Sequence, residues 1–315
     1  MAADYLHSHP QFSDLIRIVA AEKRVDPALV EKDYWIMHCL YGLQQLDMTF
    51  ELKGGTSLSK GFQIINRFSE DIDIRIEPPE DQQVKIGPNQ DRPAHVESRR
   101  TFYDWLAKTI RIEGIDKVER DTTFDNKTLR SGGIRLFYES TTGPIEGLKE
   151  GILLEVGFDD VTPNSAKDIG SWAYDYAAGK VDIIDNRAKA VACYDPGYTF
   201  VEKLQTVSTK FRQQEGSKDR PIDFMRHYYD IYGLLQRPEV QASSGHRRIG
   251  HIRTSDFRKR TIRTSRKTKL SSSAMRRPAR PTPKLTPIRA LSTTASRRYS
   301  TRFSEKSLLG AIDYE

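Results

Sequence analysis

The chain has few cysteines and no long apolar segment. Only Cys39 and Cys193 among its 315 residues are cysteine, too few for a disulfide framework or a four-ligand zinc site. No apolar run approaches the roughly 18 to 20 residues that a membrane helix needs. Residues 1–7 also lack the basic and apolar regions of a signal peptide. We therefore expect a cytoplasmic protein with no membrane partner.

Net positive charge is missing from most of the chain. The whole sequence has 50 Lys and Arg against 43 Asp and Glu, which gives a net charge of +7. Residues 241–315 contain 19 of the basic and only four of the acidic side chains, so their net charge is +15 and that of residues 1–240 is −8. This asymmetry separates an acidic body from a basic tail.

Two helical patterns open the acidic body. Apolar residues recur with helical spacing from Phe12 to Val19. Asp26 and Pro27 then supply an N-cap and the first residue of a second helix. Residues 1–48 are therefore predicted to be N-terminal helices.

Strand and helix patterns alternate in the next part of the chain. Isoleucines at 72, 74 and 76 alternate with the charged residues Asp71, Asp73 and Arg75, as in a strand with one buried face. Further strands are expected at 49–53, 133–139 and 152–158, and helices at 58–65 and 102–112. These patterns predict an α+β fold whose core, residues 49–165, is a small mixed sheet flanked by helices.

Helical patterns return near residue 200 and at 222–235, so residues 166–240 are predicted to form a helical lobe. The sequence from 241 to 315 is rich in Ser, Thr and Arg and has no sustained period. Such composition buries too little apolar surface to offset the entropy of ordering, and we expect a disordered basic tail.

A glycine turn joins the first predicted strand to a helix. Gly54 and Gly55 allow backbone N–H groups to approach a phosphate at the helix N-terminus. Thr56, Ser57 and Lys60 add hydroxyl and ammonium donors beside them. The sequence thus predicts a nucleotide-binding turn, although Gly-Gly-Thr alone is also a common turn.

Three acidic residues form a candidate metal site. Asp71 and Asp73 lie on one face of a strand, and like charges so close destabilise each other unless a cation joins them. Mg²⁺ or Mn²⁺ suits such oxygen ligands. Glu155, on the less apolar face of strand 152–158, either shares this metal or pairs with Arg135 across the sheet. Three carboxylates beside a phosphate cradle are typical of metal-assisted nucleotidyl transfer.

The motif Lys53-Gly-Gly-Thr-Ser-Leu-Ser-Lys60, followed by Phe68-Ser-Glu-Asp-Ile-Asp73, resembles the AbiEii/AbiGii abortive-infection toxins, nucleotidyltransferases of the DNA polymerase β superfamily. Glu31-Lys-Asp-Tyr-Trp35 resembles the same family, and the resemblance covers about residues 10–240. It implies a minimal nucleotidyltransferase fold, a nucleoside triphosphate substrate and a divalent metal. It also implies the toxin role in a type IV toxin–antitoxin system with a cognate antitoxin. Some relatives add nucleotides to the 3′ end of tRNA.

The family's later motifs place a Lys on one helix and an Asp on the next. Glu202-Lys203-Leu204 resembles the first, and Lys203 suits a triphosphate contact or a solvated helix face. Arg226-His-Tyr-Tyr-Asp230 resembles the second, with His227 where relatives usually have Asp. We favour Asp230 as the functional acid, with Asp223 as the second choice. His227 alternatively packs beside Tyr228, with Asp223 as its ionic partner.

Two questions stay open at the level of sequence. Family helices would continue beyond residue 240, so residues 241–315 are either a genuine tail, which binds RNA or only adds solubility, or an out-of-frame translation. The leading hypothesis is a metal-dependent nucleotidyltransferase toxin that acts on RNA such as tRNA, with Asp71, Asp73, Glu155 and Asp230 as catalytic residues. The alternatives are a non-catalytic relative that binds nucleotide or RNA, and transfer to a protein hydroxyl or a small molecule.

Overall fold

The computed structural model describes residues 3–215 and 224–244. All of these described residues belong to one compact unit. None of the helices in this described part is long and apolar enough to cross a membrane.

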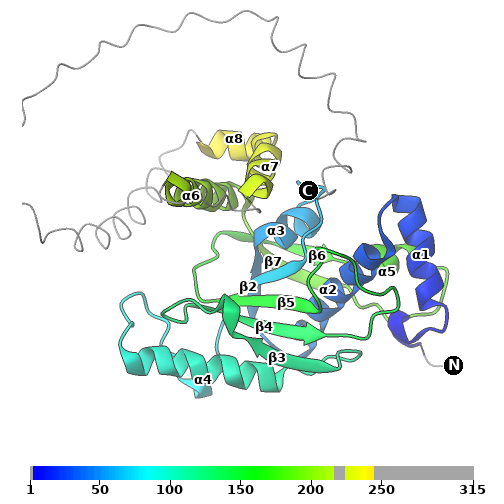
Figure 1. Cartoon of the computed structure of the whole chain (residues 1–315), viewed down its shortest axis with the longest axis horizontal. Coiled ribbons are helices and arrows are strands. Elements are labelled where there is room, and N and C mark those ends of the chain that lie inside the picture. Colours follow the sequence, from blue (N-terminus) through cyan, green and yellow to red (C-terminus); the bar gives the residue numbers. More distant parts are fainter. Residues whose placement is uncertain (1–2, 216–223, 245–315) are drawn as a thin grey trace, which may run out of the picture. The chain divides into compact units, whose positions relative to one another are not determined.

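A mixed seven-stranded sheet forms the centre of this unit, with strand order β3-β4-β5-β2-β1-β7-β6 (Figure 1). The strands are β1 (Phe50–Lys53), β2 (Asp71–Ile76), β3 (Lys117–Asp121), β4 (Ser131–Phe137), β5 (Ile152–Gly157), β6 (Asn164–Ile169) and β7 (Ala188–Tyr194). The pairs β2–β5 and β1–β7 are parallel, and the other pairs are antiparallel. The α+β class with a mixed sheet is therefore confirmed.

Helices precede, interrupt and follow the strands. They are α1 (Phe12–Lys23), α2 (Pro27–Gln45), α3 (Gly54–Thr56), the π-helical turn η2 (Ser57–Gly61), α4 (Pro93–Thr109), α5 (Trp172–Ala177), α6 (Pro196–Glu215), α7 (Phe224–Leu235) and α8 (Pro238–Ser244). Short 3-10 turns are η1 (Leu6–Ser8), η3 (Glu80–Gln82) and η4 (Thr122–Phe124). Helix α2 begins as predicted, because the Asp26 carboxylate accepts a hydrogen bond of 2.8 Å from the Ala28 amide.

The main core joins the isoleucines of β2 to apolar side chains of α2 and α4. Ile72, Ile74 and Ile76 are buried, while Asp71 and Asp73 on the other face of β2 are only partly buried. The alternation expected from the sequence is thus confirmed. It leaves the carboxylates on the side of the strand that the core does not use.

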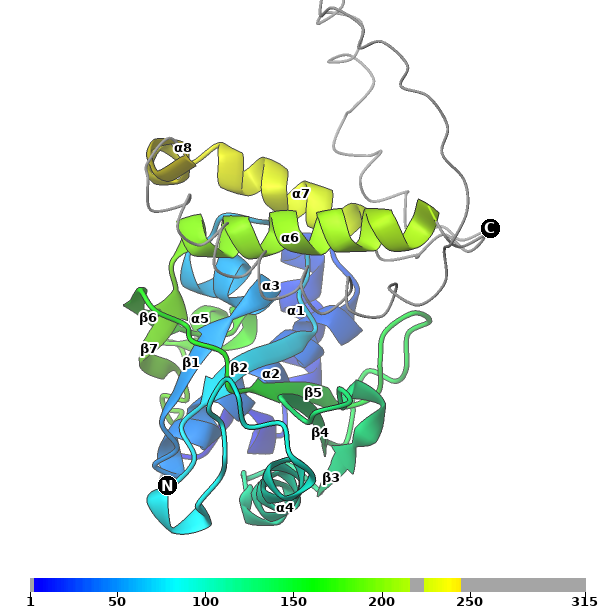
Figure 2. The ribbon, with the colours of Figure 1, turned by 90° about the vertical axis from the view of Figure 1, so that its left-hand side faces the viewer.

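A second, smaller apolar cluster fixes the C-terminal helices. Leu58 and Ile65, from the connection between β1 and β2, pack with Phe200, Leu234 and Val240 from α6, α7 and α8. Figure 2 shows α6 and α7 running side by side. This cluster places the polar faces of α6 and α7 near the start of β2.

Several elements differ from the sequence-based expectation. The helix predicted at 58–65 ends at Gly61, because the chain leaves helical geometry and Gln63 adopts a φ of 53°. Strands β6 and β7 extend the same sheet past residue 165, the expected end of the core. Helix α8 continues beyond residue 240. The predicted tail from residue 245 onward lies outside the described residues, as does Asp223.

Candidate active site

Three carboxylates meet where β2 and β5 lie side by side. Asp73 is opposite Glu155 of β5 on one side and opposite Lys53 of β1 on the other. Asp71 lies two residues earlier on the same face of β2. All three carboxylates line a cavity of about 400 Å³, the carboxylate cavity. The structure therefore brings together the acids that the sequence singled out.

These carboxylates repel one another. Burial raises the pKa of Asp73 and neighbouring Asp71 raises it further, although Lys53 opposes both. Burial, followed by the charge of Asp73, raises the pKa of Glu155 to about 7. The site thus concentrates negative charge that its own side chains do not fully neutralise.

Lys149 balances part of this negative charge. The Lys149 ammonium lies 3.3 Å from Asp71 Oδ2 and 3.7 Å from Glu70 Oε1. Arg135 does not reach Glu155, because it is bonded to Asp121 at 2.6 Å. In the register of the sheet the residue of β4 opposite Glu155 is Gly133, which has no side chain to offer.

No group of three or more His, Cys, Asp or Glu side chains within residues 3–215 and 224–244 is arranged as a ready metal site. The chemistry of the cavity nevertheless fits a divalent cation. Its acidic donors are all carboxylate oxygens, which hard cations prefer. Burial and the neighbouring carboxylates raise the pKa values of Asp73 and Glu155, and a bound cation would oppose both effects.

Glycine is required at this turn because neighbouring side chains, including the Asp73 carboxylate, occupy the space that a Cβ atom would need. Gly54 has a φ of +73°, and a Cβ atom there would lie 2.0 Å from Asp73 Oδ2. A Cβ on Gly55 would lie 2.6 Å from Ser69 Oγ and 2.9 Å from Arg67 Nη2. Gly55 also lines the carboxylate cavity. The absence of side chains here lets the turn pack closely against β2 and the segment before it.

Thr56, Ser57 and Lys60 do not join this cavity, contrary to the expectation that all three would contact phosphate. The buried Thr56 hydroxyl donates to the Asp71 carbonyl at 2.5 Å, so it positions β2. Ser57 is also buried, and its hydroxyl has no hydrogen-bond partner within the described part of the chain. Lys60 faces a different cavity, because the π-helical turn directs its ammonium to Asp33, 2.5 Å away.

Cations from the helical lobe and the segment before β2 form the opposite side of the cavity. Lys203 of α6, Arg226 of α7 and Arg67 line it, and we call these three residues the basic wall. Lys203 Nζ lies 2.9 Å from Asp230, and Arg67 donates two hydrogen bonds of 2.6 and 2.7 Å to the same carboxylate. Asp230 thereby joins α7 to α6 and to the start of β2.

The buried Asp230 differs from the carboxylates of the sheet. Burial acts to raise its pKa, but the hydrogen bond from Arg67 and the charge of Lys203 outweigh burial and lower it. Asp230 does not line the carboxylate cavity. It orders two cations of the basic wall and is not positioned to contact a metal there.

His227 lines the cavity as a neutral imidazole. Burial and the charges of Lys203 and Lys210 lower its pKa to about 4. Its Nε2 lies 3.1 Å from Lys210 Nζ, so the ammonium donates to the ring. His227 thus interacts with a cation, where the family motif would place a carboxylate.

Sequence reasoning assigned no role to Arg67, Lys149 or the three charged residues 31–33. Each of those three is buried and fixes a different loop. Glu31 accepts hydrogen bonds from the amides of residues 141 and 142, and Lys32 donates to Glu70 and to the Lys149 carbonyl. Asp33 binds Lys60 and the Trp172 amide. The sequence signal for these roles was a run of three charged residues, Glu-Lys-Asp, inside a mostly buried helix.

Clustered acids and cations line one cavity beside a glycine turn, a combination that suits nucleotidyl transfer. A family model described as "Nucleotidyl transferase AbiEii toxin, Type IV TA system" matches residues 36–297. The chain belongs to this family and is a nucleotidyltransferase toxin of a type IV toxin–antitoxin system.

Two solved structures resemble the fold at low sequence identity. One is an antigenic nucleotidyltransferase-like protein from Paracoccidioides brasiliensis, with 12% identity and a TM-score of 0.33 over 77% of this chain and 95% of that one. The other is the antibiotic-resistance factor ANT(2'')-Ia, with 11% identity and a TM-score of 0.35 over 77% and 98%. No curated protein matches the chain significantly. The assignment therefore rests on the family match.

Proposed function

We propose that this toxin transfers a nucleotide from a nucleoside triphosphate to a hydroxyl group of an RNA acceptor in the cytoplasm and releases pyrophosphate, with the 3′ end of tRNA as the leading candidate. The observation that carries the proposal is the row of Asp71, Asp73 and Glu155 facing the basic wall across one cavity. Opposed acidic and basic surfaces suit a reaction between a polyanion and a hydroxyl group.

The three carboxylates would hold Mg²⁺ or Mn²⁺. When bound, such a cation neutralises charge at the α-phosphate and makes the acceptor hydroxyl more acidic. Glu155, with a pKa of about 7 raised by burial and by Asp73, can accept a proton near neutral pH. The proposal thus assigns Glu155 two roles, as a metal ligand and as a proton acceptor.

The remaining residues bind and orient the triphosphate. Gly55, which lines the cavity, would bring the backbone of the glycine turn close to the phosphates. Lys203 and Arg226 provide positive charge for the phosphates on the opposite side. Asp230 fixes Lys203 and Arg67 in place, so we assign it a positioning role.

The test is incubation of the protein with labelled nucleoside triphosphates and a tRNA pool in Mg²⁺. We expect labelling by the parent chain and none by Asp71→Asn, which removes a charge with little change in shape. Asp14→Asn is the matched control, because Asp14 is an exposed residue of α1. Equal labelling by the parent and Asp71→Asn would refute the site assignment, and no labelling of RNA by the parent would refute the acceptor.

A further inference from the structure

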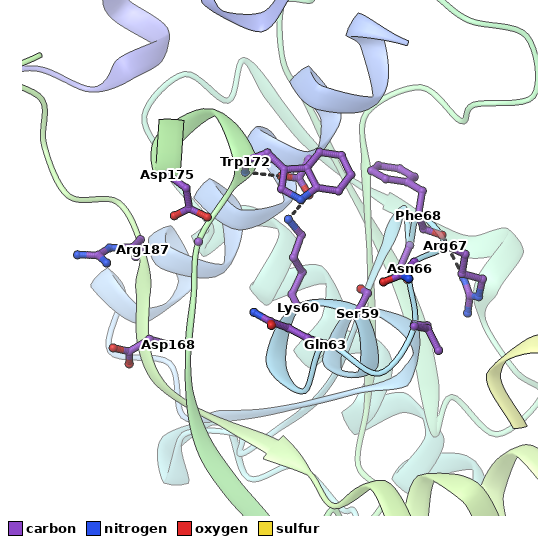
Figure 3. Close-up of a pocket in the computed structure, with 14 residues that line it drawn as sticks. Ser59, Lys60, Gln63, Asn66, Arg67, Phe68, Asp168, Trp172, Asp175 and Arg187 are labelled. Carbon is purple, nitrogen blue, oxygen red and sulfur yellow. Dashed lines mark hydrogen bonds and ion pairs between the residues drawn. The ribbon is translucent and has the colours of Figure 1, made fainter. Parts of the chain in front are cut away.

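A second cavity shares part of its lining, residues 67–69, with the carboxylate cavity. It has a volume of about 410 Å³ and is shown in Figure 3. We call this cavity the Trp172 pocket. Three residues, Arg67, Phe68 and Ser69, line both the Trp172 pocket and the carboxylate cavity. A single short segment therefore borders two cavities, each of a size that accommodates a nucleoside.

The strongest cations of the Trp172 pocket are already paired. The Lys60 ammonium lies 2.5 Å from Asp33 and 4.4 Å from the centre of the Trp172 ring. Asp33 also accepts a hydrogen bond of 2.8 Å from the Trp172 amide. Arg187 is bonded to Asp185 at 2.7 Å. The pocket is therefore poorly suited to a free phosphate.

Exposed polar side chains line the same pocket. Gln63 and Asn66 contribute amides, and Asp175 contributes a carboxylate that interacts electrostatically with Arg187 (Figure 3). Phe68 and Trp172 add aromatic surface, with ring centres 6.3 Å apart. Two amides, one carboxylate and aromatic rings suit a neutral, planar group with donors and acceptors along its edge. A nucleobase has this chemistry.

We propose that the Trp172 pocket binds an unpaired nucleobase of the acceptor RNA, next to the nucleotide whose hydroxyl reacts in the carboxylate cavity. This inference rests on the proposed function, since it names a subsite for the same acceptor. The shared segment at residues 67–69 lets neighbouring nucleotides occupy the two cavities that it borders. Single-stranded RNA ends are commonly recognised through splayed bases of this kind.

The test uses the full chain with two substitutions in the pocket, Gln63→Gly and Asn66→Ala. Gln63 has a φ of 53°, which glycine tolerates, so this change removes the amide without backbone strain. Gln83→Gly is its matched control, because Gln83 also has a positive φ, 46°, and lines neither cavity. Asn89→Ala is the control for Asn66→Ala.

We expect each pocket substitution to weaken tRNA-pool binding about tenfold, the scale of one lost base contact. Binding is measured in the Asp71→Asn background, where no transfer occurs. In the active background, the KM for RNA should rise and the KM for the nucleoside triphosphate should not. The two control substitutions should leave all of these values unchanged.

Three results would overturn the proposal. They are unchanged RNA binding in both pocket variants, a rise in the KM for the nucleoside triphosphate alone, and tighter binding of free cytidine or adenosine than of RNA. The last two would identify the ligand as the incoming nucleotide or a free nucleoside. If the parent transfers no nucleotide to RNA, the proposed function fails, while binding by Asp71→Asn still reports separately on the pocket.

Discussion

Asp73 lines the carboxylate cavity and is partly buried, whereas Asp230 is fully buried against Arg67 and Lys203, and the two carboxylates have opposite electrostatic environments. Asp73 has other carboxylates beside it, and its pKa is raised by burial and by Asp71. Asp230 accepts from Arg67 and Lys203, which lower its pKa against the effect of burial. The uncompensated acid is available to a cation from outside, whereas the compensated acid maintains the structure. The difference in environment supports the proposal that Asp73 binds a cation and that Asp230 positions other side chains.

The largest expected effect that separates the two acids is on catalysis. Asp73→Asn should lower the rate of nucleotide transfer by roughly 10³-fold, because it removes a carboxylate that would hold the cation beside the reacting phosphate. Its melting temperature should stay the same or rise, since the substitution relieves repulsion. Initial rates with labelled nucleotide and thermal melting of the same preparation test this. A clear loss of stability in Asp73→Asn would show that Asp73, like Asp230, maintains the folded structure.

Asp230→Asn should chiefly affect stability. It leaves two cations without their counter-charge, and breaking a buried pair in this way costs about 3 to 5 kcal/mol. Urea unfolding measures the change. Asp185→Asn is the control, because Asp185 is paired with Arg187 but is 40% exposed, and we expect a loss there of less than about 1 kcal/mol. Equal losses for both variants would contradict the role assigned to Asp230.

Glu155→Gln should stabilise the protein at pH 8 by about 1 to 2 kcal/mol and have little effect at pH 4. The pKa of Glu155 is about 7 in the folded chain, above its ordinary value of 4.5. Its favourable contribution is present at low pH and is lost as the pH rises through 7, where the folded state must accept the charge. Unfolding curves of parent and variant at both pH values give the difference. A constant difference would show that Glu155 is not under electrostatic strain.

Lys149→Gln should produce the smallest effect, a several-fold increase in affinity for Mn²⁺, because the Lys149 ammonium competes for Asp71. Mn²⁺ binding to the nucleotide-free protein can be followed by electron paramagnetic resonance. Lys108→Gln, at an exposed position on α4, is the control. Unchanged or weaker Mn²⁺ binding in Lys149→Gln would show that Lys149 does not oppose a cation.

Much of the fold could be predicted because its central strands carry strong patterns. The isoleucines of β2 alternate with acids, and β5 is an apolar strand with one charged residue. Strand β6 was missed because five of its six side chains are exposed or only partly buried. An edge strand of this kind has no apolar alternation to detect. The missing strands did not prevent the prediction that Asp71, Asp73 and Glu155 meet.

The site was predicted less evenly, for a geometric reason. Residues on regular strands were placed correctly, because period 2 fixes their direction. Lys60 was misplaced, because it follows the glycine turn directly in sequence but points from a π-helical turn to Asp33. Lys149 and Arg67 lie in irregular segments, where no period indicates which way a side chain points. Their contacts depend on tertiary packing alone.

The buried charged residues 31–33 limit how far the chain can be truncated from its N-terminal side. The family match begins at residue 36, inside α2 and just after these three residues. A polypeptide trimmed to that boundary would retain every predicted site residue. It would lose the side chains that tie the loops at 70, 141, 149 and 172 to one helix. The region that matches the family therefore begins later in the sequence than the segment needed to hold the loops around the candidate active site.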